Sequence, residues 1–393
     1  MNIFITGFGC ISPIGFDVQD NRKNLILEKN GLVHSSYLES KYAKTKYFGE
    51  IPKSTESLST LLNFDNILGL TRTDIIAFIA FNEACEHAKL SSNDISSTST
   101  AFISASTVGG MNQTNELYND ANFLAQPSHF INSYNCGAHN LHISQHYKIK
   151  GITNTINTAC SSSANAILFG TRLIKSGRVK RAIVGGVDSL AKYTVNGFNS
   201  LQILSNSPCS PFDENRDGLN LGEAAAYIVL ESEESCKSKT KYARIIGTGN
   251  ANDAFHVSAL SDNGIGIQQC MQKAIDEAQI SKKDITYINA HGTGTPNNDL
   301  VESNTFHTFF EETPLFSSTK SYTGHTLGAS GALESIYCIL SLINNELYPN
   351  LQTKQALSKT LLTKYISDKA ISSIMSNSYG FGGNCTSLIF SHA

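Results

Sequence analysis

One cysteine stands where a strand gives way to a helix, a position that suits covalent acyl chemistry. Cys160 follows a run of alternating apolar residues that starts at Gly151, and it precedes an apolar segment that continues to Ile174. These patterns predict a strand and then a buried helix, which Lys175 and Gly177 end. A helix N-terminus favours the thiolate, the nucleophilic form of cysteine. A buried core cysteine is the alternative, because free cysteine packs as a small apolar residue.

Two histidines with small neighbours are the next candidates for chemistry. His291 follows the apolar run 287–290 and precedes Gly-Thr-Gly-Thr-Pro, while His325 follows Gly324 and opens a segment rich in glycine and alanine. We expect His291 at the carboxyl end of a strand, where open α/β sheets bind ligands; an exposed loop histidine is the alternative. A cysteine can hold an acyl group as a thioester, and two imidazole N–H groups can stabilise an enolate or assist loss of carbon dioxide.

Two charged residues accompany the second histidine. Lys320 and Glu334 are the only lysine, arginine or carboxylate residues in the stretch 317–334. If they are buried, they must pair, and the alternative is two separate surface charges. The glycine-rich stretch 376–385 is not followed by Gly-Lys-Ser/Thr, so we do not expect a nucleotide site there.

The elements that must position these residues occur twice. The stretch 84–95 lines up with 274–285, each predicting a helix end, a turn and a strand, and Gly7-Phe8-Gly9 is echoed by Gly247-Thr248-Gly249. Two echoes in the same order indicate duplicated halves, 1–236 with the cysteine and 237–393 with both histidines. Strands that alternate with helices predict mostly parallel sheets covered by helices in a layered α/β protein.

Composition narrows the class of protein and its compartment. The chain has 393 residues, 40% hydrophobic and 16% charged, with a net charge of −3, so we expect no nucleic-acid partner. We find no long uncharged apolar run and no signal-peptide pattern at the N-terminus, so we expect no membrane span. The nine cysteines show no Cys-x-x-Cys spacing, which favours reduced thiols in the cytoplasm. The histidines show no metal-ligand spacing, so we predict no catalytic metal and no bound cofactor.

Six motifs in order make the chain similar to a known family. They are Ile-Thr-Gly-Phe-Gly, Thr-Ala-Cys-Ser-Ser, Pro-Phe-Asp…Arg-Asp-Gly, Asn-Ala-His-Gly-Thr-Gly-Thr-Pro, Ser-Ser-Thr-Lys-Ser…Gly-His and Asn-Ser-Tyr-Gly-Phe-Gly-Gly. Almost end to end, the chain resembles the elongating β-ketoacyl-acyl carrier protein synthases of the thiolase superfamily. The resemblance implies a thiolase-type fold, with two duplicated halves in a five-layered αβαβα stack, and a homodimer. It also implies decarboxylative condensation of malonyl-carrier protein with an acyl group in fatty-acid elongation.

The resemblance also implies roles for individual residues. Cys160 would take the acyl chain from its carrier protein. His291 and His325 would bind the malonyl thioester carbonyl and promote decarboxylation. Lys320, paired with Glu334, would support the site electrostatically.

Further residues match the family's binding positions. The backbone N–H groups of Cys160 and Phe381 would form the oxyanion hole, and Phe381 and Phe198 would gate and line the acyl pocket. Thr293 and Thr295 would bind the carrier's phosphopantetheine arm, which enters as substrate. Val108 would lie at the pocket floor, where its modest size permits medium to long chains.

The chain departs from the family pattern in two places. After the Phe-Gly-Gly motif the family usually has Thr-Asn, whereas this chain has Asn384-Cys385, so the hydrogen bonding of the loop differs. The stretches 193–201 and 218–223 are more similar to ketosynthases of aryl-polyene pigment pathways. A ketosynthase of such a pathway, or of a type II polyketide pathway, is therefore the main alternative function. A heterodimer with a related ketosynthase-like subunit is the alternative to a homodimer. A degradative thiolase and a non-catalytic chain-length factor are further alternatives, disfavoured because the cysteine, the lysine and both histidines are present.

Overall fold

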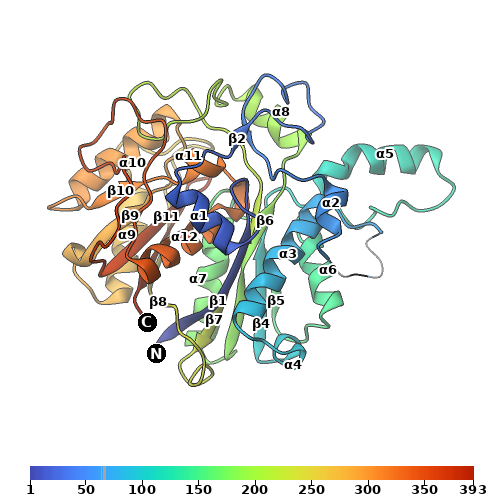
Figure 1. Cartoon of the computed structure of the whole chain (residues 1–393), viewed down its shortest axis with the longest axis horizontal. Coiled ribbons are helices and arrows are strands. Elements are labelled where there is room, and N and C mark those ends of the chain that lie inside the picture. The colour runs from blue at the N-terminus through green and yellow to red at the C-terminus, as the bar shows by residue number, and fades with distance from the viewer. Residues whose placement is uncertain (63, 65–67) are drawn as a thin grey trace.

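The computed structural model describes residues 1–62, 64 and 68–393 (Figure 1). Within this part of the chain, a ten-stranded sheet has the order β10-β9-β11-β12-β8-β1-β7-β6-β4-β5. Its N-terminal strands are β1 (Ile3–Ile11), β4 (Thr100–Ala105), β5 (Thr153–Ile156), β6 (Arg181–Asp188) and β7 (Ala224–Ser232). Its C-terminal strands are β8 (Ala243–Asn252), β9 (Ile285–Asn289), β10 (Leu315–Ser317), β11 (Ser373–Tyr379) and β12 (Asn384–Ser391). A separate small sheet pairs β2 (Leu32–Val33) with β3 (Phe48–Gly49).

The two sets of strands repeat one topology. Read outward from the centre, they run β1-β7-β6-β4-β5 and β8-β12-β11-β9-β10. In each set the first two pairings are antiparallel and the last two are parallel, and an antiparallel pairing of β1 with β8 joins the sets. The sheets are therefore mixed, and the expectation of mostly parallel sheets is wrong: β7 runs antiparallel to both β1 and β6, and β12 runs antiparallel to both β8 and β11.

The glycine motifs show why the repeat is visible in the sequence. Gly7 lies inside β1, where an added Cβ would stand 2.4 Å from the backbone nitrogen of Ala88, at the end of helix α3 (Arg72–His87). Gly249 lies inside β8, where a Cβ would stand 1.9 Å from the carbonyl oxygen of Cys270 in helix α9 (Ile265–Ala278). In both halves the missing Cβ lets a helix backbone lie directly on the first strand. The strand expected at residues 3–5 consequently continues through these glycines to Ile11.

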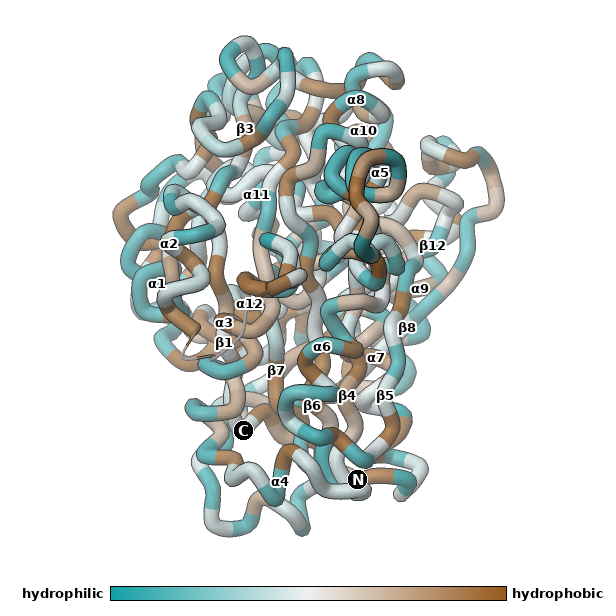
Figure 2. Tube along the Cα trace, turned by 90° about the vertical axis from the view of Figure 1, so that its right-hand side faces the viewer, coloured by the Kyte–Doolittle hydropathy of each residue, from teal (hydrophilic) through white to brown (hydrophobic). Residues whose placement is uncertain are grey.

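Helices cover both faces of the strands and fill the space between the halves. One core packs α3 and α6 (Ala138–His146) on the N-terminal strands, and another packs α9 and α10 (Pro296–Phe309) on the C-terminal strands. The largest core places α7 (Ser162–Lys175) and α12 (Ser330–Asn344) between the two sets of strands. The order is thus helix, sheet, helix, sheet, helix, which confirms the expected five layers. In Figure 2 the apolar segments concentrate on these inner strands and helices.

Shorter helices lie in the connections. They are α1 (Val18–Ile26), α2 (Thr55–Ser59), α4 (Ser92–Ser96), α5 (Thr114–Phe123), α8 (Lys192–Ser200), α11 (Lys320–Thr323) and the 3₁₀ turns η1 (Met111–Gln113), η2 (Lys282–Asp284) and η3 (Leu327–Ala329). Helix α5 projects from the body of the molecule (Figure 1). The predicted boundary between residues 236 and 237 falls in the connection from β7 to β8 and stays a prediction.

One segment corrects the expectation about apolar runs. Among the described residues, Leu327–Asn344 is long and apolar enough to cross a membrane by length and composition, although no such run was expected. It contains α12, and 89% of it is buried inside the protein. Its apolar character follows from its place between two sheets, where every face of the helix meets protein.

Candidate active site

Cys160 occupies a tight turn between β5 and α7. Ala159, just before it, has a φ of 53°, which a residue other than glycine rarely adopts. The Ser162 hydroxyl holds this turn, because it accepts from the Thr158 N–H at 2.9 Å and donates to the Ala159 carbonyl at 2.5 Å. Helix α7 begins at Ser162, two residues beyond the cysteine, and Gly177 follows its end with a φ of 71°. The expected strand, cysteine, helix and glycine stop are all present.

The two candidate histidines converge on the cysteine. His291 comes directly after the β9 segment, and His325 lies between α11 and η3. One ligand atom from each of Cys160, His291 and His325 lies within 4.8 Å of the others, although the three residues come from distant parts of the chain. The two rings are 5.4 Å apart at 85°, and both histidines are buried, so an exposed loop position for His291 is wrong.

Hydrogen bonds fix which ring nitrogen of each histidine carries the proton. The Leu327 N–H donates to Nδ1 of His325 at 3.3 Å, so we assign the proton of His325 to Nε2. The Lys320 ammonium, which has only donors, stands 3.4 Å from Nδ1 of His291, so the same assignment follows there. Both rings therefore present Nε2–H donors.

Burial keeps both imidazoles neutral. The pKa of His291 lies well below its ordinary value because the ring is desolvated, and the charges of Lys320 and His325 lower it further. The pKa of His325 is also well below its ordinary value, through burial and the charge of Lys320. At neutral pH the site thus offers two uncharged hydrogen-bond donors rather than two imidazolium cations.

Lys320 and Glu334 form the buried ion pair expected from the sequence. The Lys320 Nζ lies 2.5 Å from Oε1 of Glu334, and the side chains are 2% and 3% exposed. The same ammonium donates to the carbonyl oxygen of His291 at 2.6 Å. Burial raises the pKa of Glu334 to about 7, against the opposing pull of the Lys320 charge. The pair fixes a positive charge beside His291.

The thiol of Cys160 does not behave as its position at a helix start suggests. Burial raises its pKa to about 11, although the charge of Lys320 and the backbone N–H of Phe381 act to lower it. The expectation of a favoured thiolate is therefore wrong in this structure, because desolvation outweighs the Lys320 charge and the backbone N–H groups near the sulfur. The backbone N–H groups of Phe381 and of Cys160 itself both lower the pKa of the thiol.

Two acidic residues that were not singled out from the sequence hold the His291 loop. Glu302 accepts the backbone N–H of His291 and that of Gly292, each at 2.8 Å. Asp299 accepts the N–H of Thr293 at 3.0 Å. Both lie on α10 and both are fully buried. The signal available in the sequence is their spacing of three residues, which places both carboxylates on one face if the segment is helical.

A third buried acid, Asp188, was also missed. Its carboxylate accepts the N–H groups of Thr107 and Val108 at 3.0 Å and that of Gly328 at 2.7 Å. It therefore ties the expected pocket floor to the turn that follows His325. The sequence shows that Asp188 ends an apolar strand, but it does not show which backbone N–H groups the carboxylate accepts.

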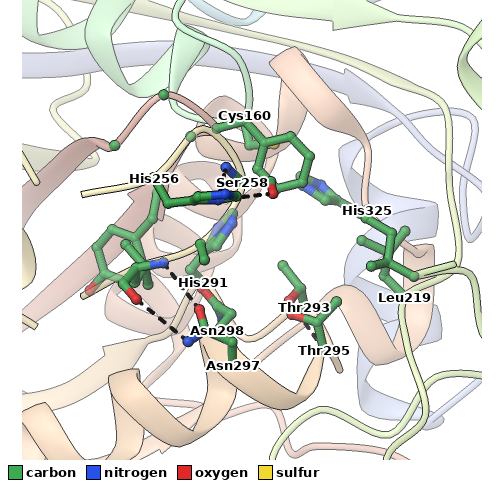
Figure 3. Close-up of a pocket in the computed structure, with 18 of the residues that line it drawn as sticks. Cys160, Leu219, His256, Ser258, His291, Thr293, Thr295, Asn297, Asn298 and His325 are labelled. Carbon is green, nitrogen blue, oxygen red and sulfur yellow. Dashed lines mark hydrogen bonds between the residues drawn. The ribbon is translucent and has the colours of Figure 1, made fainter. Parts of the chain in front are cut away.

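The residues expected to bind substrate are divided between a cavity and the core. A cavity of about 270 Å³ is lined by residues that include Cys160, Phe198, His291, Thr293, Thr295, His325 and Phe381. Figure 3 shows the cysteine and both histidines around its upper part, with the two threonines lower in the view. The rings of Phe198 and Phe381 stack 5.8 Å apart at 15°. Val108 lies outside this lining; it is 2% exposed and packs in an apolar cluster with Leu190 and Leu219.

The cysteine and two histidines are also residue types that bind zinc. A metal-bound histidine normally donates its second ring N–H to an acceptor. Here Nδ1 of His291 faces the Lys320 ammonium, and Nδ1 of His325 faces the Leu327 N–H and the Ser330 hydroxyl, which can donate to it as well. In the resulting tautomers the Nε2 atoms of His291 and His325 carry protons. They therefore offer no lone pair to a metal. This arrangement suits a hydrogen-bonded carbonyl oxygen better than a metal ion.

The fold and this site define a class of protein. A duplicated thiolase-type fold with a buried thiol beside two neutral imidazole donors is that of a condensing acyltransferase. The beta-ketoacyl synthase N-terminal domain matches residues 1–235 and the C-terminal domain matches residues 242–354, so the chain belongs to the beta-ketoacyl synthase family.

Known proteins resemble the chain over its whole length. It is 30% identical over 406 residues to 3-oxoacyl-[acyl-carrier-protein] synthase 2 of Staphylococcus aureus (strain N315), covering 99% of this chain and 97% of that one. The structure of the ketosynthase ApeO with its chain length factor ApeC from Xenorhabdus doucetiae matches with a TM-score of 0.86, 31% identity and coverage of 100% and 98%. The ishigamide ketosynthase/chain length factor matches with a TM-score of 0.93, 25% identity and coverage of 100% and 99%. These matches confirm the thiolase-type ketosynthase fold.

Proposed function

We propose that the protein is a 3-oxoacyl-[acyl-carrier-protein] synthase that lengthens fatty-acyl chains by decarboxylative Claisen condensation. The observation that carries this proposal is the convergence of Cys160, His291 and His325 within 4.8 Å, with both histidines neutral. A thiol can hold the acyl group while two N–H donors activate the malonyl thioester beside it.

The first half-reaction loads the acyl chain. The Cys160 Sγ attacks the carbonyl carbon of the acyl-carrier thioester, and the oxyanion that forms accepts the N–H groups of Cys160 and Phe381. The new Sγ–acyl bond forms and the carrier's C–S bond breaks. Because the pKa of Cys160 is about 11, the thiol proton moves as the bond forms and leaves with the carrier sulfur.

The second half-reaction extends the chain. The Nε2–H groups of His291 and His325 donate to the malonyl thioester oxygen. The C–C bond to the carboxylate breaks, carbon dioxide leaves, and the electron pair of that bond stays behind as the enolate that these donors stabilise. The enolate carbon attacks the acyl group on Cys160, the new C–C bond forms and the Sγ–C bond breaks. The sulfur then takes a proton from water. Lys320, paired with Glu334, contributes the fixed positive charge near the enolate.

Residues that line the cavity, together with Val108, would bind the substrate. Thr293 and Thr295, whose hydroxyl oxygens are 2.8 Å apart, would bind the phosphopantetheine arm along the cavity wall. The stacked Phe198 and Phe381 would gate the acyl chain. Val108 would lie at the pocket floor, which the acyl chain reaches when this stack opens.

The proposed partners are acyl carrier protein, bearing acyl or malonyl groups, and a second copy of the chain. β5 is an edge strand of the sheet, with Thr153 and Asn154 exposed, and an edge strand can pair with the same strand of another subunit. Another segment, which contains α5, exposes large apolar side chains: Tyr118, Phe123, Leu124, Ile131 and Tyr134. A related ketosynthase-like subunit is the alternative occupant. The nine unpaired cysteines agree with a cytoplasmic location.

A pigment or polyketide pathway is the second candidate function. The 31% identity to a chain of the ApeO–ApeC complex, over 100% of this chain, favours it as much as the 30% identity to the Staphylococcus enzyme favours fatty-acid elongation. The residues and the chemistry would be the same, and only the acyl chain on Cys160 would differ.

The test offers the purified protein acyl carrier proteins that bear saturated C4 to C16 chains, polyene chains or aryl-polyene chains. Intact mass then identifies the group on Cys160. Saturated chains alone support fatty-acid elongation, whereas a preference for polyene or aryl chains moves the function to a pigment pathway. Acylation by none of them contradicts both proposals and favours a non-catalytic chain-length factor.

A further inference from the structure

Asn384 is the first residue after the glycine-rich loop and one of the two positions at which the chain departs from the family pattern. It lies at the start of β12, and its side chain turns toward the segment that carries Cys160. The proposed mechanism assigns it no role, yet it joins the loop to the cysteine's own turn.

The side-chain oxygen of Asn384 accepts hydrogen bonds from three other parts of the chain. It accepts from the Ser161 hydroxyl at 2.8 Å, from Nδ2 of Asn165 at 2.8 Å and from Nδ2 of Asn250 at 3.0 Å. Ser161 directly follows Cys160, Asn165 lies in the first turns of α7, and Asn250 lies in β8. One amide oxygen thus links β12, β8 and the start of α7.

The orientation of each amide is settled by its other partners. Oδ1 of Asn165 accepts from Nδ2 of Asn250 and from the hydroxyl of Thr386, both at 3.0 Å. Nδ2 of Asn165 is therefore the atom that faces Thr158 and Asn384. Since Nδ2 of Asn165 and Nδ2 of Asn250 can only donate, the atom of Asn384 that faces them must be an acceptor.

The same residue fixes the base of the glycine-rich loop. The backbone N–H of Gly380 donates to the Asn384 carbonyl at 2.7 Å, which closes the loop that carries Phe381. Gly380 lies so close to the cysteine turn that an added Cβ would stand 2.4 Å from the Thr158 carbonyl oxygen and 3.3 Å from the Cys160 nitrogen. The loop and the cysteine turn therefore touch at their backbones, beside the side-chain network.

We propose that Asn384 is a positioning residue that holds the Phe381 loop against the Cys160 turn, and so sets the distance between the two N–H donors of the oxyanion hole. This inference rests on the proposed function, because the oxyanion hole matters only if Cys160 is acylated. Asn384 acts through Phe381 and does not touch the reacting atoms. Transfer of the acyl group to Cys160 depends on this distance, whereas malonyl decarboxylation depends on His291 and His325.

The test compares two replacements of similar size. Asn384→Asp keeps an oxygen acceptor for the three donors, and Asn384→Leu removes it. Three rates are measured: acylation of Cys160 by acyl-carrier protein in a quenched intact-mass assay, alkylation of Cys160 by iodoacetamide, and malonyl decarboxylation after Cys160→Gln is added to each variant. Asn384→Ala, which removes the acceptor without adding bulk, is the second variant if Asn384→Leu does not fold.

We expect Asn384→Leu to slow acylation at least tenfold. Loss of one oxyanion-hole donor lowers the rate of acyl transfer by about 100-fold or more, and a displaced donor loses part of that effect. Decarboxylation should stay within about threefold of the parent value, because it does not use the Phe381 N–H. Alkylation should fall together with acylation, because the Phe381 N–H lowers the pKa of the Cys160 thiol. Asn384→Asp should retain acylation.

Two outcomes overturn the inference: acylation at the parent rate without the acceptor, or equal losses in all three rates, which would indicate a general structural role. Failure of the unsubstituted protein to be acylated would instead contradict the proposed function itself.

Discussion

At the scale of single residues, the site combines a protonated thiol with neutral imidazoles. Burial dominates at all three positions, raising the pKa of Cys160 and lowering those of His291 and His325. Lys320 supplies a fixed positive charge beside them, which Glu334 balances. The site therefore stabilises negative charge where it develops, on the thioester oxygens, and leaves little charge at rest.

The first prediction concerns the pH dependence of the thiol. Iodoacetamide reacts with thiolate, and a pKa of about 11 means that the thiolate fraction of Cys160 rises about tenfold per pH unit between pH 7 and 10. The alkylation rate at Cys160, followed by peptide mass, should rise with that slope and show no plateau in the range. Levelling of the rate near pH 8 would mean that the helix terminus, not burial, controls this thiol.

The second prediction separates the two half-reactions. Cys160→Gln imitates the acyl thioester with an uncharged amide, so it should keep malonyl decarboxylation while condensation is lost. Adding His325→Ala should then lower decarboxylation by about 100-fold, because one of the two carbonyl donors is gone. Carbon dioxide release reports the result, with Cys160→Ala as the control. Unchanged release after His325→Ala would remove His325 from this step.

At the scale of elements, helix α10 and the loop before it form one unit. Glu302 and Asp299 accept backbone N–H groups of the His291 loop from inside the protein, where an unpaired N–H would be costly. The histidine is thereby placed by the helix that follows it. His325 is placed similarly, through Asp188 and the turn at Gly328.

The third prediction tests this placement. Glu302→Ala leaves the buried N–H groups of His291 and Gly292 without acceptors, so the free energy of unfolding should fall by about 2 kcal/mol or more. Decarboxylation should fall as well, since the loop shifts. Denaturant unfolding and carbon dioxide release measure the two effects. Glu302→Gln keeps one acceptor oxygen, so its free energy of unfolding and its decarboxylation rate should lie between those of the parent and of Glu302→Ala. A stable, fully active Glu302→Ala would show that Glu302 does not hold the loop in place.

Sequence and structure agree most closely where a motif is local. The strand before Cys160, the turn and the helix after it follow from apolar spacing, and the duplicated glycines reveal the duplicated halves. The raised pKa of Cys160 could not be predicted, because burial depends on chains packed from elsewhere. The same holds for Asn384, whose partners come from three distant segments, and for the antiparallel return of β7 and β12.

At the scale of the whole molecule, the two halves meet at the centre and leave β5 at one end of the sheet. The carbonyl oxygens of Ile152 and Ile156 accept from β4, so the backbone groups of Thr155 point away from the sheet. The segment that contains α5, which projects from the body of the molecule, exposes further apolar surface. These features support a paired assembly.

The fourth prediction tests that edge. Thr155→Pro removes an outward N–H without breaking the ladder to β4, so the proposed dimer should dissociate to monomers. Light scattering reads the mass, and Thr155→Val, which keeps the N–H, should remain dimeric. A dimer that survives Thr155→Pro would mean that the copies meet elsewhere, and a monomeric parent protein would favour a different subunit as partner.

The central claim is that Cys160 and the two histidines perform one condensation together. It is tested most directly by supplying acyl-carrier protein and malonyl-carrier protein and measuring the 3-oxoacyl-carrier protein that forms. The parent protein should release one carbon dioxide for each product, and Cys160→Ala should form no product. Normal turnover by Cys160→Ala would contradict the account.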